Sequence, residues 1–336
     1  MSSSSRHLGL DLGGTNIKLT VIEIHAGSEP RVVAASRVPT LAGDGPDAVT
    51  ARMVAAGRAF ATEHGPVSTV GVGIPGLFNP DTGRIKLFPN LRGSWPGFPL
   101  RDRVAHGLGL PTMIINDARA FVLAEAELGA GRGSRTLVGL TLGTGIGGGV
   151  IIDRRLHLGA TGTAGEIGHQ TVDPEGPMCG CGNRGCAEVF AQAGTIARLG
   201  GRATAEAVFM GAADGDERCR DAVATLVRAL AIAIANMVTV LVPDVIVLGG
   251  GMASAYDTLH APLLAAVRSR APLVPSGQIR IVAAELGTAA GAIGAALAGA
   301  ELADQEAVVG GKRGVRSPRS SPTPDLPSRV PTAPDE

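Results

Sequence analysis

The sequence predicts an α/β protein with two lobes. Strand patterns alternate with helix patterns along most of the chain, as expected where helices cover the faces of sheets. Two strand-turn-strand segments with glycine-rich turns, one at the start of the chain and one near its middle, each open an α/β half. A length of 336 residues is sufficient for two full cores. These observations indicate a duplicated architecture that holds a ligand between two lobes.

The first half opens with a β-hairpin. Apolar residues favour strands on both sides of Gly13, Gly14, Thr15 and Asn16, which together are typical of a turn. Apolar residues at helical spacing predict a helix further on, and a proline-rich stretch predicts an irregular segment of the kind that often forms a binding loop. The expected elements are strands over 7–12, 17–24, 67–74 and 111–115, helices over 47–64 and 118–129, and an irregular segment over 77–103.

The second half begins like the first and then becomes mostly helical. One strand leads into a run of glycines and directly into another strand. A long helix that is apolar on most faces is predicted to be central, and Pro243 ends it. The expected elements are strands over 136–142, 150–153, 245–248 and 278–284, and helices over 191–199, 203–211, 216–241, 254–268 and 289–302.

Composition bounds the class of protein. The chain is 45% hydrophobic and 18% charged, which is typical of a soluble globular protein, and its net charge of zero gives no electrostatic footprint for nucleic acid or a membrane surface. The start of the chain has no apolar run of signal-peptide length, and the apolar segment 229–242 is too short to span a bilayer, so we expect a cytoplasmic protein. From residue 303 the sequence is rich in Pro, Ser and Arg, which predicts a disordered tail over 303–336.

Three of the four cysteines gather within eight residues. Cys179, Cys181 and Cys186 are interleaved with glycines whose backbone can fold tightly around one ion, and His169 lies ten residues upstream. Thiolates and imidazole are zinc ligands, and four protein ligands make a closed tetrahedral site with no position for water. The pattern therefore predicts a structural zinc ion and leaves the chemistry to its neighbours.

Two other interpretations of these cysteines are a disulfide knot and plain packing as small hydrophobes. A knot needs an even number of cysteines and a secretory context, and neither is present. Zinc in turn needs His169 as a fourth ligand, because Cys-x-Cys-x4-Cys is not among the commonest zinc spacings. The remaining Cys219 lies in a charged helical segment and is expected to be unliganded. Two acidic residues, Glu166 and Glu188, lie beside the cluster.

Glycine turns follow three of the expected strands. Asp11 ends the first strand beside Gly13 and Gly14, whose backbone amides could approach a phosphate while Asp11 holds Mg²⁺ through water. For this turn alone a plain hairpin is the simpler interpretation. The run 143–149 contains Gly-x-Gly-x-x-Gly, but a strand follows it instead of a helix, which argues against a dinucleotide site and favours a second phosphate-binding hairpin. The third turn is formed by residues 249–251.

Asn116 and Asp117 follow the expected strand over 111–115. A lone Asp before a helix is most often an N-cap. In open α/β sheets, however, ligands gather at the carboxyl ends of strands, so this pair is also a candidate for the binding site.

Taken together, six motifs in order resemble the ROK family and, within it, the zinc-containing bacterial glucokinases. The similarity extends over about residues 8–302, and the cysteine block is its most specific part. The motifs are DLGGTNIK over 11–18, IND over 115–117, TLGTGIGGG over 141–149, EIGH over 166–169, CGCGNRGCAE over 179–188 and LGGG over 248–251.

The resemblance implies the actin-like, ribonuclease H-like fold of sugar kinases, with ATP and sugar bound between two lobes. It also implies an N-terminal lobe over 1–117, to which the helix over 289–302 returns, and a C-terminal lobe with the zinc site over 118–288. Phosphoryl transfer requires positioning, charge neutralisation by Mg²⁺ and exclusion of water, which a closing cleft supplies. A homo-oligomer, dimer or tetramer, is expected from the family.

The resemblance also implies roles for single residues. Asp117 would be the general base that takes the proton from the 6-hydroxyl of the sugar. Asn116, Glu166, His169 and Glu188 would bind the sugar, and the zinc ion would fix their positions. The residues implied for ATP and Mg²⁺ are Asp11, Gly13, Gly14, Thr15, Thr144, Gly145, Gly249, Gly250 and Gly251.

The resemblance leaves several functions open. Glucose is the favoured substrate, but N-acetylglucosamine, N-acetylmannosamine, mannose and allose kinases of the family share the zinc block, and polyphosphate could replace ATP. ROK transcriptional regulators place a helix-turn-helix domain before the first phosphate motif, and here that motif begins within a dozen residues of the start. A zinc-ribbon interaction module on an inactive kinase-like fold is another alternative, which loss of Asp117 or of the glycine turns would have favoured. A dehydrogenase is supported only by the glycine string.

Overall fold

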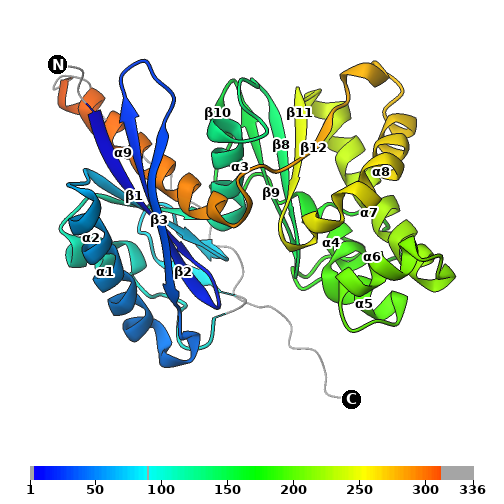
Figure 1. Ribbon diagram of the computed structural model, residues 1–336, viewed down its shortest axis with the longest axis horizontal. Coiled ribbons are helices and arrows are strands. Elements are labelled where there is room, and N and C mark those ends of the chain that lie inside the picture. The colour runs from blue at the N-terminus through cyan, green and yellow to red at the C-terminus, as the bar shows by residue number, and fades with distance from the viewer. Residues whose placement is uncertain (1–3, 89–90, 312–336) are drawn as a thin grey trace.

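The computed structural model describes residues 4–88 and 91–311, which form two lobes side by side (Figure 1). Each lobe has a five-stranded sheet. The first sheet has the order β3-β2-β1-β4-β7 and the second the order β10-β9-β8-β11-β12. In both, a central strand pairs antiparallel with the next strand of the chain and parallel with a later one, to which a further parallel strand is added. This matched topology confirms the predicted α/β class and the duplicated architecture.

The strands of the first sheet are apolar and almost wholly buried at its centre. β1 alternates little in polarity because helix α1 covers one of its faces and helix α9 the other. The elements of this lobe are β1 (Ser4–Leu12), β2 (Asn16–His25), β3 (Arg31–Pro39), α1 (Gly45–His64), β4 (Thr69–Ile74), β5 (Leu77–Phe78), β6 (Ile85–Leu87), α2 (Leu100–Leu108) and β7 (Thr112–Asn116).

The second lobe carries most of the helices. Its elements are α3 (Asp117–Leu128), β8 (Leu137–Leu142), β9 (Ile146–Ile152), β10 (Arg155–Leu156), α4 (Ala187–Ala191), α5 (Ala193–Gly200), α6 (Ala205–Ala213), α7 (Glu217–Leu241), β11 (Val245–Gly249), α8 (Tyr256–Arg270) and β12 (Ile281–Ala283), and the chain then returns to the first lobe as α9 (Ala290–Gly311).

Helices α3 and α9 form a layer between the two sheets. One core cluster contains residues of both helices together with Ile115 of the first sheet and Val247 of the second. α9 lies very close to the first sheet, because a Cβ at Gly71 would be 1.6 Å from the carbonyl oxygen of Ala295. Only glycine permits that approach. The layer positions the start of α3, which carries Asp117, at the junction of the lobes (Figure 1).

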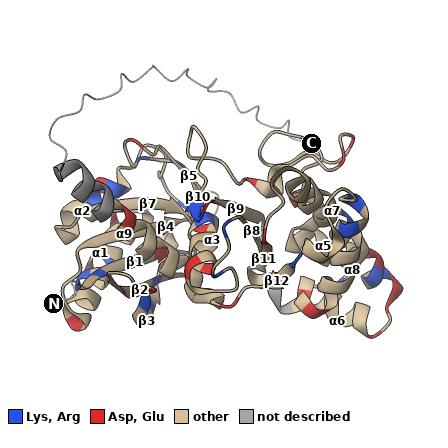
Figure 2. Ribbon diagram, turned by 90° about the horizontal axis from the view of Figure 1, so that it is seen from above, with Lys and Arg blue, Asp and Glu red and all other residues tan. Residues whose placement is uncertain are grey.

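The long helix α7 is central to the second lobe, as predicted. By length and composition it is the one helix among the described residues that could cross a membrane. More than half of that window is buried, however, and its apolar residues belong to the core cluster of this lobe. α7 is therefore the core helix of a globular lobe. Figure 2 shows acidic and basic residues interspersed over both lobes, in keeping with the balanced net charge.

Several expected boundaries were wrong. Strand β3 and helix α4 were not predicted, and the segment over 77–103, expected to be irregular, contains the β5-β6 hairpin and α2. β9 begins at Ile146, so the glycines at 147–149 belong to a strand and only residues 143–145 form the turn. The last helix does not end at residue 302: α9 continues to Gly311, inside the expected disordered tail, and residues 312–336 lie outside the described part. The division into lobes at Asp117 remains a prediction.

Candidate functional site

A cavity of about 370 Å³ opens where the two lobes meet. The first lobe contributes the end of β4, the start of α3 supplies the residues next to it, and the second lobe contributes the β8-β9 turn, the segment before the cysteines and the turn after β11. The lining residues are Pro75, Gly76, Asp117, Ala118, Thr141, Leu142, Gly143, Thr144, Gly145, Ile146, Gly147, Glu166, His169, Glu188, Gly250 and Gly251.

Asp117 is the first residue of α3, directly after β7. Asn116 is the N-cap: its Oδ1 accepts hydrogen bonds from the backbone N–H groups of Ala118 (3.1 Å) and Arg119 (3.3 Å), and its Nδ2 donates to the carbonyl oxygen of Gly76 (3.3 Å). Asn116 itself does not line the cavity. The predicted N-cap at this position therefore exists, but its residue is Asn116, and Asp117 is left to face the cavity.

The pKa of Asp117 is raised toward neutral pH. Burial, the nearby charge of Asp11 and then that of Glu166 raise the pKa of Asp117 to about 6, although the backbone N–H of Ala118 donates to its Oδ1 at 2.8 Å. A carboxylate with this pKa is mostly ionised at neutral pH and still basic enough to accept a proton.

Asp11 lies near the end of β1, almost buried, and pairs with Lys18 across the β1-β2 hairpin, with Lys18 Nζ 3.2 Å from Asp11 Oδ2. Its carboxylate lies against the first turn of α9, since a Cβ at Gly291 would be 2.7 Å from Oδ2. Burial raises the pKa of Asp11, while Lys18 acts in the opposite direction. The pair places one acid and one cation beside the cavity, although neither residue lines it.

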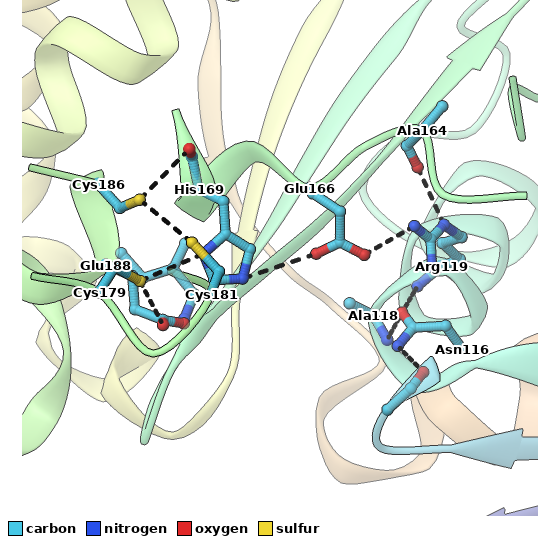
Figure 3. A network of polar contacts seen from close by, with 12 residues as sticks. Asn116, Ala118, Arg119, Ala164, Glu166, His169, Cys179, Cys181, Cys186 and Glu188 are labelled. Carbon is cyan, nitrogen blue, oxygen red and sulfur yellow. Dashed lines mark hydrogen bonds and ion pairs between the residues drawn. The ribbon is translucent and has the colours of Figure 1, made fainter. Parts of the chain in front are cut away.

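The second lobe brings Glu166, His169 and Glu188 to the cavity (Figure 3). Glu188 is held by its Oε2, which accepts from the backbone N–H of Ile146 at 2.8 Å, and this contact ties α4 to the β8-β9 turn. A Cβ at Gly145 would be 2.5 Å from the same oxygen, so a side chain there would displace the Glu188 carboxylate. Glu166 faces His169, with Glu166 Oε2 4.0 Å from His169 Nε2. These three side chains offer a polar wall to a ligand rich in hydroxyl groups.

His169 and the three clustered cysteines form a compact group, as the sequence predicts. Their ligand atoms all lie within 4.8 Å of one another. Cys181 Sγ and Cys186 Sγ are 3.7 Å apart, and Cys179 Sγ is 3.6 Å from His169 Nδ1. Around a tetrahedral zinc with Zn–S near 2.3 Å and Zn–N near 2.0 Å, neighbouring ligand atoms would be about 3.5–3.8 Å apart. The group therefore fits zinc, and the free Nε2 of His169 points toward Glu166 (Figure 3).

The backbone around the cysteines is shaped for such a site. Gly185 has φ +63° and would place a Cβ 1.5 Å from the carbonyl oxygen of Asp173, so only glycine fits. Burial and the neighbouring thiols raise the pKa of Cys186 to about 12, so a thiolate there requires a cation beside it. All four cysteines are free, which excludes the disulfide knot in this structure, and Cys219 is buried in α7 outside the group.

The structure divides the other predicted residues into two groups. Thr144, Gly145, Gly250 and Gly251 line the cavity. The remaining ones do not. Gly249 lies at the end of β11, where a Cβ would meet the ring of Phe121 at 2.4 Å, and the turn of the first hairpin is closed by hydrogen bonds to Thr40. The predicted residues that do not line the cavity are Asp11, Gly13, Gly14, Thr15, Asn116 and Gly249.

Sequence reasoning missed Arg119. This residue is 3% exposed, and its guanidinium donates to Glu166 Oε1 at 2.8 Å and to the carbonyl oxygen of Ala164 at 2.9 Å. The sequence does contain one indication of its burial: Arg119 is a charged residue in an otherwise apolar stretch of α3, two positions after Asp117. Such a residue is buried only when it has a partner.

Comparison with known proteins matches residues 7–301 to the ROK family. A glucokinase of Thermotoga maritima is 34% identical over 310 residues, which are 86% of this chain and 95% of that protein. A ROK hexokinase of Thermus thermophilus has a TM-score of 0.81 at 33% identity, covering 89% of this chain and 99% of that one. A ROK family glucokinase of Streptomyces griseus in complex with glucose and AMPPNP has a TM-score of 0.73 at 28% identity, covering 88% and 100%.

Relatives with other names match as well. An N-acetyl-D-glucosamine kinase of Haemophilus influenzae is 33% identical over 273 residues, which are 76% of this chain and 87% of that protein. A xylose repressor of Caldicellulosiruptor bescii is 33% identical over 198 residues, but these are only 54% of this chain and 49% of the repressor.

Proposed function

Because the chain belongs to the ROK family, we propose that it is an ATP-dependent sugar kinase that phosphorylates the 6-hydroxyl of a hexose, with glucose as the first candidate. The observation that carries the proposal is Asp117: a half-buried carboxylate whose pKa is raised to about 6, at the junction of two lobes, in a cavity with a polar wall on one side and glycine turns on the other.

Asp117 is the proposed general base. Its ionised carboxylate accepts the proton of the 6-hydroxyl as that oxygen attacks the γ-phosphorus of ATP, and the bond between the γ-phosphorus and its bridging oxygen breaks to release ADP. The N-cap formed by Asn116 fixes the first turn of α3 and therefore the direction of this carboxylate. Mg²⁺, when bound, would neutralise phosphate charge, and Asp11 is the residue proposed to hold it through water.

Glu166, His169 and Glu188 are proposed to bind the other hydroxyl groups of the sugar. Zinc held by His169 and the three cysteines would fix this wall, since His169 belongs to both groups and Cys179 Sγ lies 3.8 Å from Glu188 Oε1. Asn116 Nδ2 has two N–H donors; one is used by the carbonyl oxygen of Gly76, and the other is proposed for the sugar.

The glycine turns are the proposed phosphate site. Residues 143–145 and the turn at Gly250 and Gly251 line the cavity on the side of the second sheet, and the residues proposed to face the adenosine follow β11. The turn over 13–16 approaches from the first lobe and would contact the phosphates after closure of the lobes. Backbone N–H groups of the turn would supply positive potential on that side.

The choice of sugar is the finer part of the proposal. Support for glucose comes from the T. maritima glucokinase and from the S. griseus structure, whose bound ligands are glucose and AMPPNP. An N-acetylated hexose is the alternative, since the H. influenzae relative is an N-acetyl-D-glucosamine kinase at similar identity. A sugar-binding regulator is the non-enzyme alternative, since a xylose repressor of C. bescii is 33% identical over 198 residues. We also propose a cytoplasmic homo-oligomer, which light scattering would test.

The test is a coupled ADP-release assay with glucose, mannose, fructose, N-acetylglucosamine and N-acetylmannosamine, run on the wild type and on Asp117→Ala. We expect turnover with glucose and a loss of about 10²–10⁴-fold in kcat for the variant, which is the usual contribution of a general base. Activity confined to an N-acetylated sugar would retain the mechanism and replace the substrate. Absence of ADP release with every sugar, in protein that contains zinc, would exclude the kinase.

A further inference from the structure

Arg119 is a buried cation without a role in the proposal above. It lies in the first turn of α3, two residues after Asp117, and is 3% exposed. Burial of a charged side chain is unfavourable unless the charge is paired and hydrogen-bonded. Arg119 satisfies this condition with two partners, and both lie on the connection between β10 and α4 (Figure 3).

The two partners are close together in the chain. Arg119 Nη2 is 2.8 Å from Glu166 Oε1, and Arg119 Nε donates to the carbonyl oxygen of Ala164 at 2.9 Å. The planar guanidinium thus holds a side chain and a backbone group of one short segment in a fixed relation. It leaves Glu166 Oε2 turned toward His169 and the cavity.

That segment has few other contacts. Residues 157–166, all within the described part of the chain, are half-buried or exposed. Their other contacts include backbone hydrogen bonds from His157 to Val150 and from Ala164 to Leu158, and the packing of Gly165 against β9. Gly159, Gly162 and Gly165 have positive φ, and glycine-rich backbone loses much conformational entropy on ordering. Contacts with a charged, buried donor are therefore large relative to the other interactions that position Glu166.

We propose that Arg119 is a positioning residue for the sugar: it orders the segment 157–166 and holds Glu166 with one carboxylate oxygen directed at the cavity. This inference rests on the proposed function, because it assigns Glu166 to the bound hexose. Arg119 does not touch the substrate and acts through Glu166. It also ties the helix that carries the base to the wall that binds the sugar.

The proposal predicts which kinetic constant changes. Glu166 would bind a sugar hydroxyl in the ground state and in the transition state alike, so loss of its position should raise KM for the sugar more than it lowers kcat. The KM for ATP should change little, because the phosphate turns lie on other elements. Lysine at position 119 would retain the charge but could not hold Glu166 and the carbonyl of Ala164 together, so it should restore part of the affinity.

The experiment compares Arg119→Met, Arg119→Lys, Glu166→Gln and the double variant Arg119→Met/Glu166→Gln in the full chain. We expect Arg119→Met to raise the KM for the preferred hexose by about 10- to 100-fold, the range for a lost charged hydrogen bond, and Arg119→Lys to raise it less. In the Glu166→Gln background the same change should raise it by less than about 3-fold, because the two residues act as one unit. Arg202→Met, which removes an exposed ion pair of 2.7 Å with Asp216, is the matched control and should leave both KM values unchanged.

The outcomes separate the inference from the proposed function. A wild-type enzyme that is active while Arg119→Met has an unchanged sugar KM would overturn the inference alone. The same holds if Arg119→Met raises the KM by an equal factor with and without Glu166, which would indicate a structural role independent of that residue. A wild type that is inactive with every hexose would overturn the proposed function and this inference with it. If Arg119→Met does not fold, Arg119→Lys and its double variant provide the same comparison.

Discussion

The two walls of the cavity are built by different forces. Asp117 is positioned by packing: β7 and α3 meet there, and Ile115, Ala120 and Phe121 around it belong to the core cluster between the sheets. The opposite wall comes from a long connection between β10 and α4 with little regular structure. There Ile167 is the residue buried in the core, and the side chains of Glu166 and His169 on either side of it are held by polar contacts with Arg119 and by the ligand group of His169 and the cysteines.

This difference teaches that the base and the sugar-binding wall can be damaged separately. A core held by apolar contacts responds to a change of volume with a loss of overall stability. A connection held by a metal responds to loss of the metal with local disorder, because the binding energy of the ion orders the segment. Variants in the two walls should therefore have different signatures.

Among the changes that separate the two walls, the largest effect is expected from loss of the metal. In Cys186→Ser the ligand group has three members, and we expect the zinc content to fall and kcat/KM for the hexose to drop on the order of 100-fold, because the wall that binds the sugar loses its anchor. Zinc content would be measured by atomic emission and kinetics by ADP release. We expect only a small change in the melting temperature of Cys186→Ser beside this large loss of activity.

Cys219→Ser is the matched control for this comparison. Cys219 is fully buried in α7 but lies outside the ligand group, so serine there should lower stability through burial of a hydroxyl and leave the zinc content unchanged. If both serine variants retain zinc, or if Cys186→Ser loses zinc and keeps its full activity, the ion does not hold the sugar-binding wall.

The zinc prediction shows where sequence reasoning was sufficient. Ligand chemistry is specific to residue type and spacing, so the grouping of His169 and the three cysteines was predicted without coordinates, and so were the positions of most strands along the chain. Asp117 was a candidate because ligands gather at the carboxyl ends of strands in open α/β sheets, and its role as the base stays a prediction. These features depend on local sequence.

The features that were missed depend on contacts between distant segments. Arg119 reads as one charged residue in a helix, and only the folded chain shows that Glu166, 47 positions away, is its partner. Strand β3 was missed because its residues are mostly half-buried or exposed at the edge of the sheet, which weakens the apolar signal. The close approach of α9 to Gly9 and Gly71 likewise involves residues more than 200 positions apart.

That approach gives the next prediction, which tests the packed wall. In Gly71→Ala the new Cβ would be 1.6 Å from the carbonyl oxygen of Ala295, so α9 must move away from the first sheet. We expect the free energy of unfolding to fall by about 3 kcal/mol, the upper end for an overpacked core, while the zinc content stays the same. Denaturant unfolding followed by circular dichroism would measure it.

Gly194→Ala is the matched control for that substitution. Gly194 lies in α5 with nothing within 4 Å of its Cβ position, so alanine should be neutral or stabilise the protein by about 0.5–1 kcal/mol. If Gly71→Ala and Gly194→Ala change the free energy of unfolding equally, α9 is not packed tightly against the first sheet. The wall that carries Asp117 would then be no more rigid than the wall that binds the sugar.

The smallest effect concerns the base itself, in protein free of ligands and Mg²⁺. The folded-state pKa of Asp117, about 6, is above its ordinary value of 3.8, so between these values the folded state binds more protons than the unfolded state. Stability therefore falls as the pH rises from about 4 to about 6 and stays lower above that range, by about 1–3 kcal/mol. Asp117→Asn lacks this carboxylate and should be more stable than the wild type at pH 8 and equal to it near pH 4.

Unfolding of the two proteins at pH 4, 6 and 8 would measure this difference, and the acid limb of kcat/KM in the wild type should fall near the same pH of about 6. If the free energies of unfolding of the wild type and Asp117→Asn depend on pH in the same way, ionisation of Asp117 does not lower the stability of the fold. If Asp117→Asn is instead more stable than the wild type at pH 8 and inactive, the ionised Asp117 lowers the stability of the fold. The protein then retains this charge because catalysis requires it.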